Sequence, residues 1–533
     1  MRKMSPSFKG KRQNSMQNND SQSRHEKALY ERYNREMTID GDLMYIGRLL
    51  ERAARMAPNR IALICRDKTI TYRDLYRRTC VFSAHLKQHD VKPRDRVLLF
   101  FENSIEFYIG YFAILHVGAI VAPLNTMLGE RELFHIMTDA QPKMMVAQQT
   151  LIERFKNMSS LGIPIVTEAE MVVPTQDEAV DETIIACKPD ELAALLYTSG
   201  TTGLPKGVML SSRNMMSNVL QALTRYEPGT HEIVFGVLPM FHSFAQNTCV
   251  WASLFRLYTV IVVPHIDRRA ILEGLKYKPT IFLGVPALYG LMCLLKTAPL
   301  ESVRLFISGG DALPDKIRAG FSLLYRRRIC SGYGMTETSP VVSVDLDDET
   351  VPTSNVGRPC YGVHVEVRDA NGAKVPQGSI GELWIAGDNV MMGYYNAPDV
   401  TNATIKDGWL ASGDLGYLDE KGRIVITGRS KDLIKHKGVN IYPQEVENVL
   451  LSHANVIRAA VIGIPDEATG EVPVAYVQVR NADEPMEGEL KALCMRDLAS
   501  YKVPRTFICV TYDLPTTATG KVDKKKLRAE HKS

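Results

Sequence analysis

The chain lacks the cysteine pattern of a secreted or zinc-binding protein. Its nine cysteines are scattered along 533 residues, with no CxxC pair and no nearby histidine at metal-ligand spacing. Such isolated thiols are typical of a reducing, cytosolic compartment. The chain also lacks an apolar run of about 20 residues, the length that a membrane helix needs. A disulfide scaffold and a membrane-spanning protein are therefore excluded, and any membrane contact would be peripheral.

An excess of charge of one sign is missing as well. Lysine and arginine number 64 and acidic residues 60, and this balance excludes nucleic acid as the main partner. Apolar residues make up 45% of the chain, which is ample for a core, and 533 residues are too many for a single one. The composition predicts a soluble globular protein of two or more domains.

The N-terminal region, residues 1–38, is polar and has no apolar segment like that of a secretory signal. We expect a disordered polar tail. Its first nineteen residues carry five basic side chains and no acidic one, which leaves open an organelle transit peptide or a tether to anionic lipid.

From residue 45 onward, helical and strand patterns alternate, which predicts α/β layers. Strands are expected at residues 61–65, 96–101, 119–123, 280–285 and 303–308, and helices at 46–54 and 104–117. Short β-rich runs between glycines predict a small β-barrel-like subdomain over about 352–427. Past residue 428, helix and strand patterns of a separate α+β domain begin.

The sharpest local feature is YTSGTTGLPKG, residues 197–207, between an apolar run and a short strand. Glycines let backbone N–H groups approach an anion, hydroxyls add donors, and Lys206 adds positive charge. The segment is not a Walker loop, which ends in Gly-Lys-Ser/Thr and opens a helix. On its own it suits polyphosphate, and a flexible hairpin loop is the simpler alternative.

Six further motifs follow in a fixed order. They are PMFHSFA (239–245), SGGDAL (308–313), GYGMTETSP (332–340), WLASGDLG (409–416), GRSKDLIKHKGVNIYPQEVE (428–447) and LPTTATGKV (514–522). The ordered set resembles the adenylate-forming superfamily, and most closely its acyl-CoA synthetases, over about residues 46–527. The resemblance implies a large N-terminal domain of layered α/β subdomains (39–428), a hinge (429–432) and a mobile α+β C-terminal domain (433–533).

The resemblance also implies which residues bind ATP or AMP. They are Thr198, Ser199, Gly200, Thr201, Thr202, Gly203, Lys206, Gly309, Gly310, Asp311, Gly332, Tyr333, Gly334, Thr336, Asp414, Arg429, Lys435 and Lys521. Among these, Thr202 is expected to take part in catalysis.

Three acidic or basic residues of these motifs, Glu337, Asp414 and Arg429, have expected roles with a clear physical basis. Glu337 is expected to be catalytic and to hold Mg²⁺, which prefers oxygen ligands and shares its shell with substrate phosphates. The carboxylate of Asp414 would accept hydrogen bonds from both ribose hydroxyls. Arg429 would contact ribose or phosphate with its planar fork. Isolated, these residues would equally fit a surface turn or a salt bridge.

Lys521 is the expected catalytic cation of the first step. The resemblance places it between the substrate carboxylate and the α-phosphate, where two anions must meet. A cation there stabilises the transition state more than the ground state. By composition alone, Lys521 belongs to a solvated basic tail.

The second half-reaction needs access for a thiol, which domain movement can provide. The resemblance places the hinge at Lys431 and assigns Lys437 and Gly438 to the coenzyme A path. His242 matches a position beside the reacting carboxylate, so we expect it to orient or gate the reactants, although a lone histidine on an apolar run is more often a core residue.

The acyl pocket is expected around His242, Ser243, Gly284, Gly309 and Gly334, where glycines remove side-chain volume. The sequences of the motifs most resemble those of enzymes that act on medium- or long-chain fatty acids, so such an acid is the expected substrate. ATP, Mg²⁺ and coenzyme A are the expected cosubstrates and cofactor. Aromatic acids, or transfer to a carrier protein by an acyl-AMP ligase, remain alternatives, and so does a non-catalytic nucleotide- or acyl-binding protein. We expect a cytoplasmic monomer or homodimer.

Overall fold

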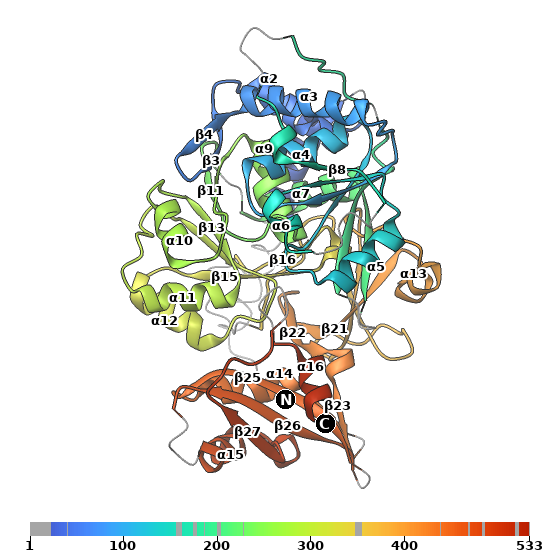
Figure 1. The fold of residues 1–533 in the computed structure, drawn as a ribbon. Coiled ribbons are helices and arrows are strands. Elements are labelled where there is room, and N and C mark those ends of the chain that lie inside the picture. The colour runs from blue at the N-terminus through green and yellow to red at the C-terminus, as the bar shows by residue number, and fades with distance from the viewer. Residues whose placement is uncertain are drawn as a thin grey trace.

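The structure is a computed structural model and describes residues 23–39, 41–155, 162–173, 179–185, 187–199, 204–226, 229–346, 354–437, 439–466, 469–481, 486–516 and 522–531. Helices and strands alternate through a large N-terminal domain, below which a smaller C-terminal domain hangs in Figure 1. The mixed α/β class expected from the sequence is confirmed. Among these residues, no helix combines the length and the hydropathy needed to cross a membrane.

A seven-stranded sheet carries the glycine- and threonine-rich loop. Its strand order is β19-β10-β9-β6-β5-β7-β8. The strands are β5 (Arg96–Phe100), β6 (Ile120–Pro123), β7 (Met144–Ala147), β8 (Ile165–Thr167), β9 (Leu192–Ser199), β10 (Pro205–Ser211) and β19 (Gly393–Tyr394). The central strands run parallel and are buried along almost their whole length, because helices cover both faces of such a sheet.

An eight-stranded sheet forms the second layer. Its order is β16-β15-β14-β13-β11-β12-β3-β4, and only the two edge strands are antiparallel to their neighbours. The strands are β3 (Ile61–Cys65), β4 (Lys68–Thr71), β11 (Ile233–Gly236), β12 (Thr259–Val262), β13 (Ile281–Gly284), β14 (Leu305–Ser308), β15 (Ile329–Gly334) and β16 (Val341–Val344). The carboxyl ends of its parallel strands meet at one edge, which is where ligands bind in such sheets.

Helices surround both sheets. They are α2 (Leu49–Met56), α3 (Tyr72–Gln88), α4 (Ile105–His116), α5 (Glu130–Ala140), α6 (Gln149–Ile152), α7 (Ser212–Tyr226), α8 (Ser243–Ala245), α9 (Ser253–Arg256), α10 (Arg268–Leu275), α11 (Pro286–Leu295) and α12 (Asp315–Tyr325), with a π-helix η4 (Gln246–Ala252) between α8 and α9. Helix α4 is buried on every side, since its sequence is apolar all round.

Two further units complete the chain, the first with an antiparallel sheet and the second with a mixed sheet in which β26 and β27 run parallel. The first holds β17 (His364–Arg368), β18 (Gly381–Ala386), α13 (Pro398–Thr404), β20 (Ile405–Lys406), β21 (Trp409–Leu418) and β22 (Ile424–Arg429). The C-terminal unit holds β23 (Ile434–His436), β24 (Val439–Ile441), α14 (Pro443–Ser452), β25 (Val456–Asp466), β26 (Gly470–Val479), α15 (Met486–Asp497), β27 (Thr506–Val510) and α16 (Lys524–His531). The second unit has its own hydrophobic core between its sheet and α14 and α15.

The N-terminal region differs from the sequence-based expectation. Residues 23–37 form a helix, so the prediction of a disordered tail is wrong for this stretch. Leu29, Tyr33 and Met37 are buried. They lie four residues apart and therefore share one face of the helix. Tyr33 packs edge-on against Phe255 of α9, with the ring centroids 6.2 Å apart. These three large side chains on one face are enough to pack the helix against the domain, although its composition is otherwise polar.

An ion pair fastens the same helix. Glu26 Oε1 lies 2.5 Å from Arg225 Nη1 of α7, and the Arg225 side chain is only 1% exposed. Arg225 also donates to the carbonyl oxygen of Val344 at 3.2 Å. A guanidinium this deeply buried depends on a counter-charge.

We expect Glu26→Gln to lower the stability of the fold by about 2 kcal/mol, because an amide removes a negative charge beside the buried guanidinium of Arg225. Differential scanning calorimetry should show a lower unfolding midpoint. Glu31→Gln is the matched control, since Glu31 lies in the same helix, is 53% exposed and pairs only loosely with Lys27 at 3.9 Å. Equal shifts in the two variants would contradict the proposed role of the pair.

Candidate active site

The glycine- and threonine-rich loop connects two antiparallel strands. β9 and β10 pair with Ser199 opposite Pro205, so the connection is a hairpin and not the strand-to-helix turn of a Walker loop. Four of the expected phosphate-binding residues lie outside the described residues, namely Gly200, Thr201, Thr202 and Gly203, as does the side chain of Ser199. Thr198 lies on β9, at the entrance to the hairpin.

Both arms of the hairpin are tied to α5. The hydroxyl of Tyr197 donates to Asp139 Oδ2 at 2.7 Å. The carbonyl oxygen of Pro205 lies 2.9 Å from His135 Nε2. Burial raises the pKa of Tyr197, with a further contribution from the Asp139 charge, so the phenol remains a hydrogen-bond donor. These contacts fix where the loop begins and ends.

Tyr394 contacts both Lys206 and Glu337, the predicted metal ligand. The sequence did not indicate this tyrosine as a site residue. The Lys206 Nζ atom lies 5.6 Å from the centre of the Tyr394 ring. The hydroxyl of Tyr394 donates to Glu337 Oε1 at 2.9 Å. Strand β19, which carries Tyr394, pairs with β10 and so brings the tyrosine beside the loop. Nothing in the local sequence indicates this contact.

The carboxyl group of Glu337 is electrostatically unusual. Burial raises its pKa, while the Tyr394 hydroxyl and the positive charge of Arg429 lower it in part. The ionised form is stabilised by its own backbone N–H, by the Tyr394 hydroxyl and by the more distant cation Arg429. A nearby positive charge would favour the ionised form further.

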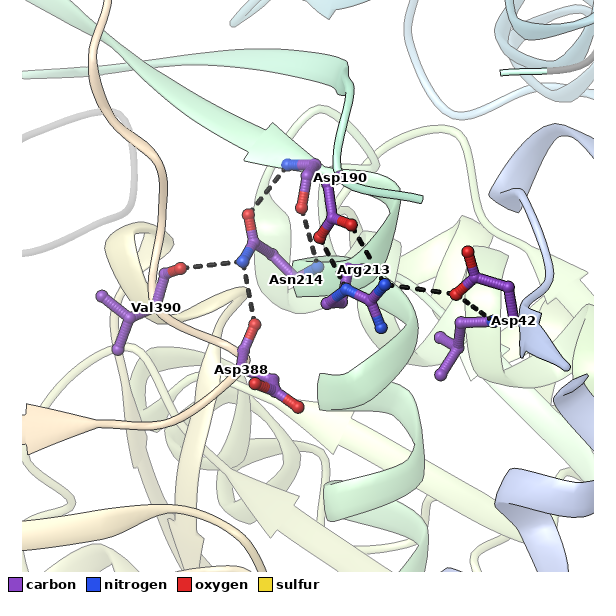
Figure 2. A network of polar contacts seen from close by, with 8 residues as sticks. Asp42, Asp190, Arg213, Asn214, Asp388 and Val390 are labelled. Atoms are coloured by element: carbon purple, nitrogen blue, oxygen red, sulfur yellow. Dashed lines mark hydrogen bonds and ion pairs between the residues drawn. The ribbon is translucent and has the colours of Figure 1, made fainter. Parts of the chain in front are cut away.

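The turn that carries Glu337 is held by a loop at residues 388–391, which α7 supports. Figure 2 shows that Asn214 donates from Nδ2 to the carbonyl oxygens of Asp388 and Val390, each at 2.8 Å. Its neighbour Arg213 binds Asp190 and Asp42, which anchors the start of the helix.

Residues on that loop then bond directly to the turn. Asn389 Nδ2 donates to the carbonyl oxygen of Thr338 at 3.1 Å, and Ser339 Oγ donates to the carbonyl oxygen of Asn389 at 2.9 Å. The N–H of Met391 donates to the carbonyl oxygen of Glu337 at 2.9 Å. Helix α7 therefore holds the loop at residues 388–391, and this loop in turn holds the backbone of Glu337.

The expected ribose site brings three predicted residues together. Asp414 Oδ2 accepts a hydrogen bond from the Tyr333 hydroxyl at 2.8 Å, and Asp414 Oδ1 lies 2.8 Å from Arg429 Nε. Asp414 and Arg429 face each other across β21 and β22. Near them, Gly334 cannot be replaced without movement, because a Cβ there would lie 1.9 Å from the carbonyl oxygen of Pro340.

A cavity opens beside these residues. Much of its lining is apolar, including Ala222, Tyr226, Ile281, Leu283, Ile307 and Val344. His242, Ser243, Gly309, Gly310, Gly332, Tyr333 and Gly334 also line it, together with Asn247 and Thr248 of the π-helix. No Asp, Glu, Lys or Arg is among the described residues that line this cavity.

His242 and Ser243 occupy the edge of the cavity nearest the predicted phosphate contacts. His242 is the N-cap of α8, and its Nδ1 accepts a hydrogen bond from the N–H of Phe244 at 3.3 Å. The Ser243 and Thr336 hydroxyl oxygens lie 3.2 Å apart. Through this contact Thr336 is linked to the cavity, although it does not line it.

Two predicted residues lie elsewhere. Gly284 does not line the cavity, because successive residues of a strand face opposite sides and its Cβ position faces Tyr289 and Leu288 of α11. Its neighbour Leu283 faces the cavity instead. Asp311 is exposed and accepts a hydrogen bond from the N–H of Ala312, away from the cavity lining.

The expected hinge and the expected C-terminal site residues follow β22 in the sequence. Lys431 belongs to the short helix η6 (Ser430–Asp432), and Asp432 of this helix pairs with Arg528 of α16 at 2.9 Å. Lys435 and Lys437 are exposed around β23 and do not line the cavity. Lys521 and Gly438 lie outside the described residues.

Comparison with known proteins now adds to this geometry. A model of the AMP-binding enzyme family matches residues 50–395, and a model of the AMP-binding enzyme C-terminal domain matches residues 445–521. The chain belongs to the AMP-binding enzyme family. The expected membership of its acyl-CoA synthetase branch is confirmed, and with it the prediction of an acid–thiol ligase.

Its relatives act on different acids. The chain is 32% identical to a long-chain-fatty-acid–CoA ligase of Yersinia pestis, over 90% of this chain and 93% of the relative. It is also 32% identical to a feruloyl-CoA synthase of an Amycolatopsis species, over 90% and 97%. The solved o-succinylbenzoate CoA synthetase of Bacillus subtilis, in complex with ATP and magnesium, is 28% identical, with a TM-score of 0.81 over 91% and 99%.

We expect Tyr394→Phe to move the acid limb of the pH–activity profile upward by about one unit. The lost hydrogen bond stabilises ionised Glu337, so its removal raises the pKa of this carboxyl further. A carboxyl with a higher pKa becomes protonated at a higher pH, and activity would decline there first. The measurement is acid-dependent pyrophosphate release at a series of pH and Mg²⁺ concentrations.

Tyr395→Phe is the control for this experiment. Tyr395 is the next residue and packs against a hydrophobic core. An acid limb that moves equally in both variants, or in neither, would show that the Tyr394–Glu337 contact does not set the ionisation of the site.

Proposed function

We propose that this enzyme joins a medium- or long-chain fatty acid to coenzyme A, using ATP and passing through an acyl-adenylate. One observation carries the proposal. Tyr333 lines the apolar cavity and at the same time donates its hydroxyl to Asp414. An acid bound in the cavity would therefore lie next to the site we assign to the nucleotide.

The assigned nucleotide site extends from ribose to phosphates. Asp414 would accept hydrogen bonds from the ribose hydroxyls, and Arg429 would contact ribose or phosphate. Residues 198–203 and Lys206 would bind the phosphates through N–H groups, hydroxyls and charge. The ring of Tyr333 would provide a flat apolar surface for the adenine.

The residues present also fit a magnesium ion. Glu337 supplies a hard oxygen ligand whose raised pKa indicates a carboxylate short of positive charge. We assign the ion to Glu337, where it would neutralise charge on the phosphates of ATP.

In the first step, the substrate carboxylate attacks the α-phosphorus of ATP, and pyrophosphate leaves. Lys521 would stabilise the negative charge that gathers between the two anions. At about 4 Å and an effective dielectric constant near 20, one such charge contributes about 4 kcal/mol, or roughly a thousandfold in rate. Hydroxyls of the loop, that of Thr202 included, would orient the departing phosphates.

In the second step, the thiol of coenzyme A attacks the acyl carbonyl carbon and AMP leaves. We propose that the C-terminal domain turns about Lys431 between the steps, which exchanges Lys521 for the segment with Lys437 and Gly438. Lysines on this path suit the phosphates of coenzyme A. His242, at the cavity edge, would position the reactants, since a thiol needs little help to ionise.

The cavity lining favours an apolar monocarboxylic acid. An amino acid would need a carboxylate for its ammonium group, and a dicarboxylic acid would need a cation for its second carboxylate. The described lining offers neither. A hydroxylated aromatic acid is the second candidate, because the Thr248 hydroxyl stands at the cavity wall and the feruloyl-CoA synthase is as similar as the fatty-acid ligase.

We expect a panel of acids to separate the candidates. Medium- and long-chain fatty acids should release pyrophosphate and form a thioester faster than ferulate, and malonate should be inactive because its second carboxylate would lie unpaired in the cavity. The measurement is pyrophosphate release and thioester formation, with and without coenzyme A.

The other outcomes of this assay have distinct meanings. Faster turnover of ferulate would favour the aromatic-acid ligase. Acid-dependent pyrophosphate release without any thioester would indicate transfer to a carrier protein. Absence of release with every acid would support a non-catalytic binding protein.

We expect Lys521→Ala to abolish adenylation and to leave thioester formation from supplied acyl-adenylate largely intact. The lysine would act on the α-phosphate only in the first step, so the two half-reactions should respond differently. Lys525→Ala is the matched control, because Lys525 is a neighbouring basic residue to which we assign no role. Equal loss of both half-reactions in Lys521→Ala would contradict the assignment.

We also propose a cellular compartment, an oligomeric state and a membrane contact for the enzyme. A cytoplasmic monomer or homodimer fits its cysteines, none of which forms a disulfide. Peripheral contact with an anionic membrane is supported by Leu294 and Leu323, exposed at the ends of α11 and α12 beside basic Arg326 and Arg327. Co-sedimentation with anionic vesicles, absent for neutral ones, would test it.

A further inference from the structure

Two imidazoles and a carboxylate converge on the outer side of the N-terminal domain, away from the cavity lining. His85 lies in the last turn of α3, and His89 follows four residues later as the C-cap. This spacing places both side chains on one face of the helix. Glu170 ends the short helix η3 (Glu168–Glu170), and one ligand atom from each of the three residues lies within 4.8 Å of the others.

The contacts within this group are close. The rings of His85 and His89 have centroids 4.7 Å apart. His85 Nε2 lies 3.4 Å from Glu170 Oε2. Thr167 donates its N–H to the other oxygen of Glu170 at 3.0 Å, so the carboxylate is oriented by its own helix.

A second observation points to a ligand. The Nε2 atom of His85 is shielded from solvent and forms no hydrogen bond in the described part of the chain. Its ring is stacked on Phe82, with centroids 5.8 Å apart and an interplanar angle of 19°. Packing therefore holds the ring with Nε2 facing Glu170, and a shielded polar atom that forms no hydrogen bond is costly.

Nearby lysines are engaged elsewhere. Lys87 lies 2.8 Å from Asp181, and Lys92 and Lys143 both pair with Asp90. With neutral imidazoles, the group of two histidines and one glutamate carries a negative charge. A cation would be attracted to it.

We propose that His85, His89 and Glu170 bind one divalent transition-metal ion, with zinc as the preferred ion and a fourth position left for water. Two imidazoles and one carboxylate are a donor set that Zn²⁺ accepts. Mg²⁺ prefers an octahedron of oxygen atoms, so the magnesium of the reaction would not compete.

Closure of the site needs only small movements. Tetrahedral ligands at Zn²⁺ bond lengths lie roughly 3.3 Å apart. The pair of His85 and Glu170 is already at 3.4 Å. His89 and Glu170 are exposed, so their side chains have room to adjust and the wider separations in the group can close.

The metal would fasten η3 to α3. Met171, the residue after Glu170, is buried, and residues 171–191 lead from η3 to β9. A ligand that binds only the folded arrangement stabilises it. Zinc would thus brace the connection between the two halves of the seven-stranded sheet, without touching the residues assigned to catalysis.

The test is calorimetric titration of ZnCl₂ into the full-length, tag-free, chelator-treated protein in a reducing buffer with excess Mg²⁺. We expect one equivalent of Zn²⁺ to bind and to raise the unfolding midpoint. His89→Ala and Glu170→Gln should each weaken binding at least about tenfold while the metal-free proteins unfold normally.

His265→Ala is the matched control. His265 Nδ1 lies 3.5 Å from Glu102 Oε1, a partly exposed pair to which the described structure adds no second imidazole. This variant should bind Zn²⁺ as the unmodified protein does. Absence of binding, or binding that His89→Ala and Glu170→Gln leave unchanged, would overturn the proposal.

Discussion

The hydrogen bond from Tyr333 to Asp414 is the contact on which the arrangement of the site depends. Tyr333 lies near the end of β15 in the eight-stranded sheet, and Asp414 lies on β21 of the antiparallel unit, so one bond of 2.8 Å joins two sheets. Arg429 completes the contact from β22, two residues before Lys431, the proposed hinge residue. The sheet that shapes the cavity, the unit that would hold the ribose and the start of the proposed mobile domain therefore share one cluster.

Two carboxylates of the site are held in different ways. Asp414 has the cation Arg429 at 2.8 Å, whereas Glu337 has a neutral phenol, that of Tyr394, at 2.9 Å. A carboxylate paired with arginine is already neutralised and can serve as a hydrogen-bond acceptor for a sugar. A carboxylate whose hydrogen bonds come from a phenol and its own backbone N–H keeps its charge available, and the loop through Asn214 and Asn389 holds it in place.

The sequence predicted the elements that depend on local pattern. The strands at 96–101 and 303–308 and the helix at 104–117 were found because apolar spacing alone determines them. The helix at 23–37 was missed, since three apolar residues in a polar stretch carry little signal. Gly284 was misplaced because the face of a strand depends on register, and a glycine gives no sign of it. Tyr394 was missed because only the pairing of β19 with β10 brings it to Glu337.

The position of Tyr333 makes the acid site and the proposed nucleotide site depend on each other. Its ring forms part of the cavity wall, and its hydroxyl is committed to Asp414. A substrate that displaced the ring would weaken the Asp414 cluster, and a nucleotide that engaged Asp414 would fix the wall against which the acid packs. The two ligands therefore cannot be arranged independently. Since adenylation requires the carboxylate and the α-phosphate to meet at one point, a shared wall favours the geometry in which they react.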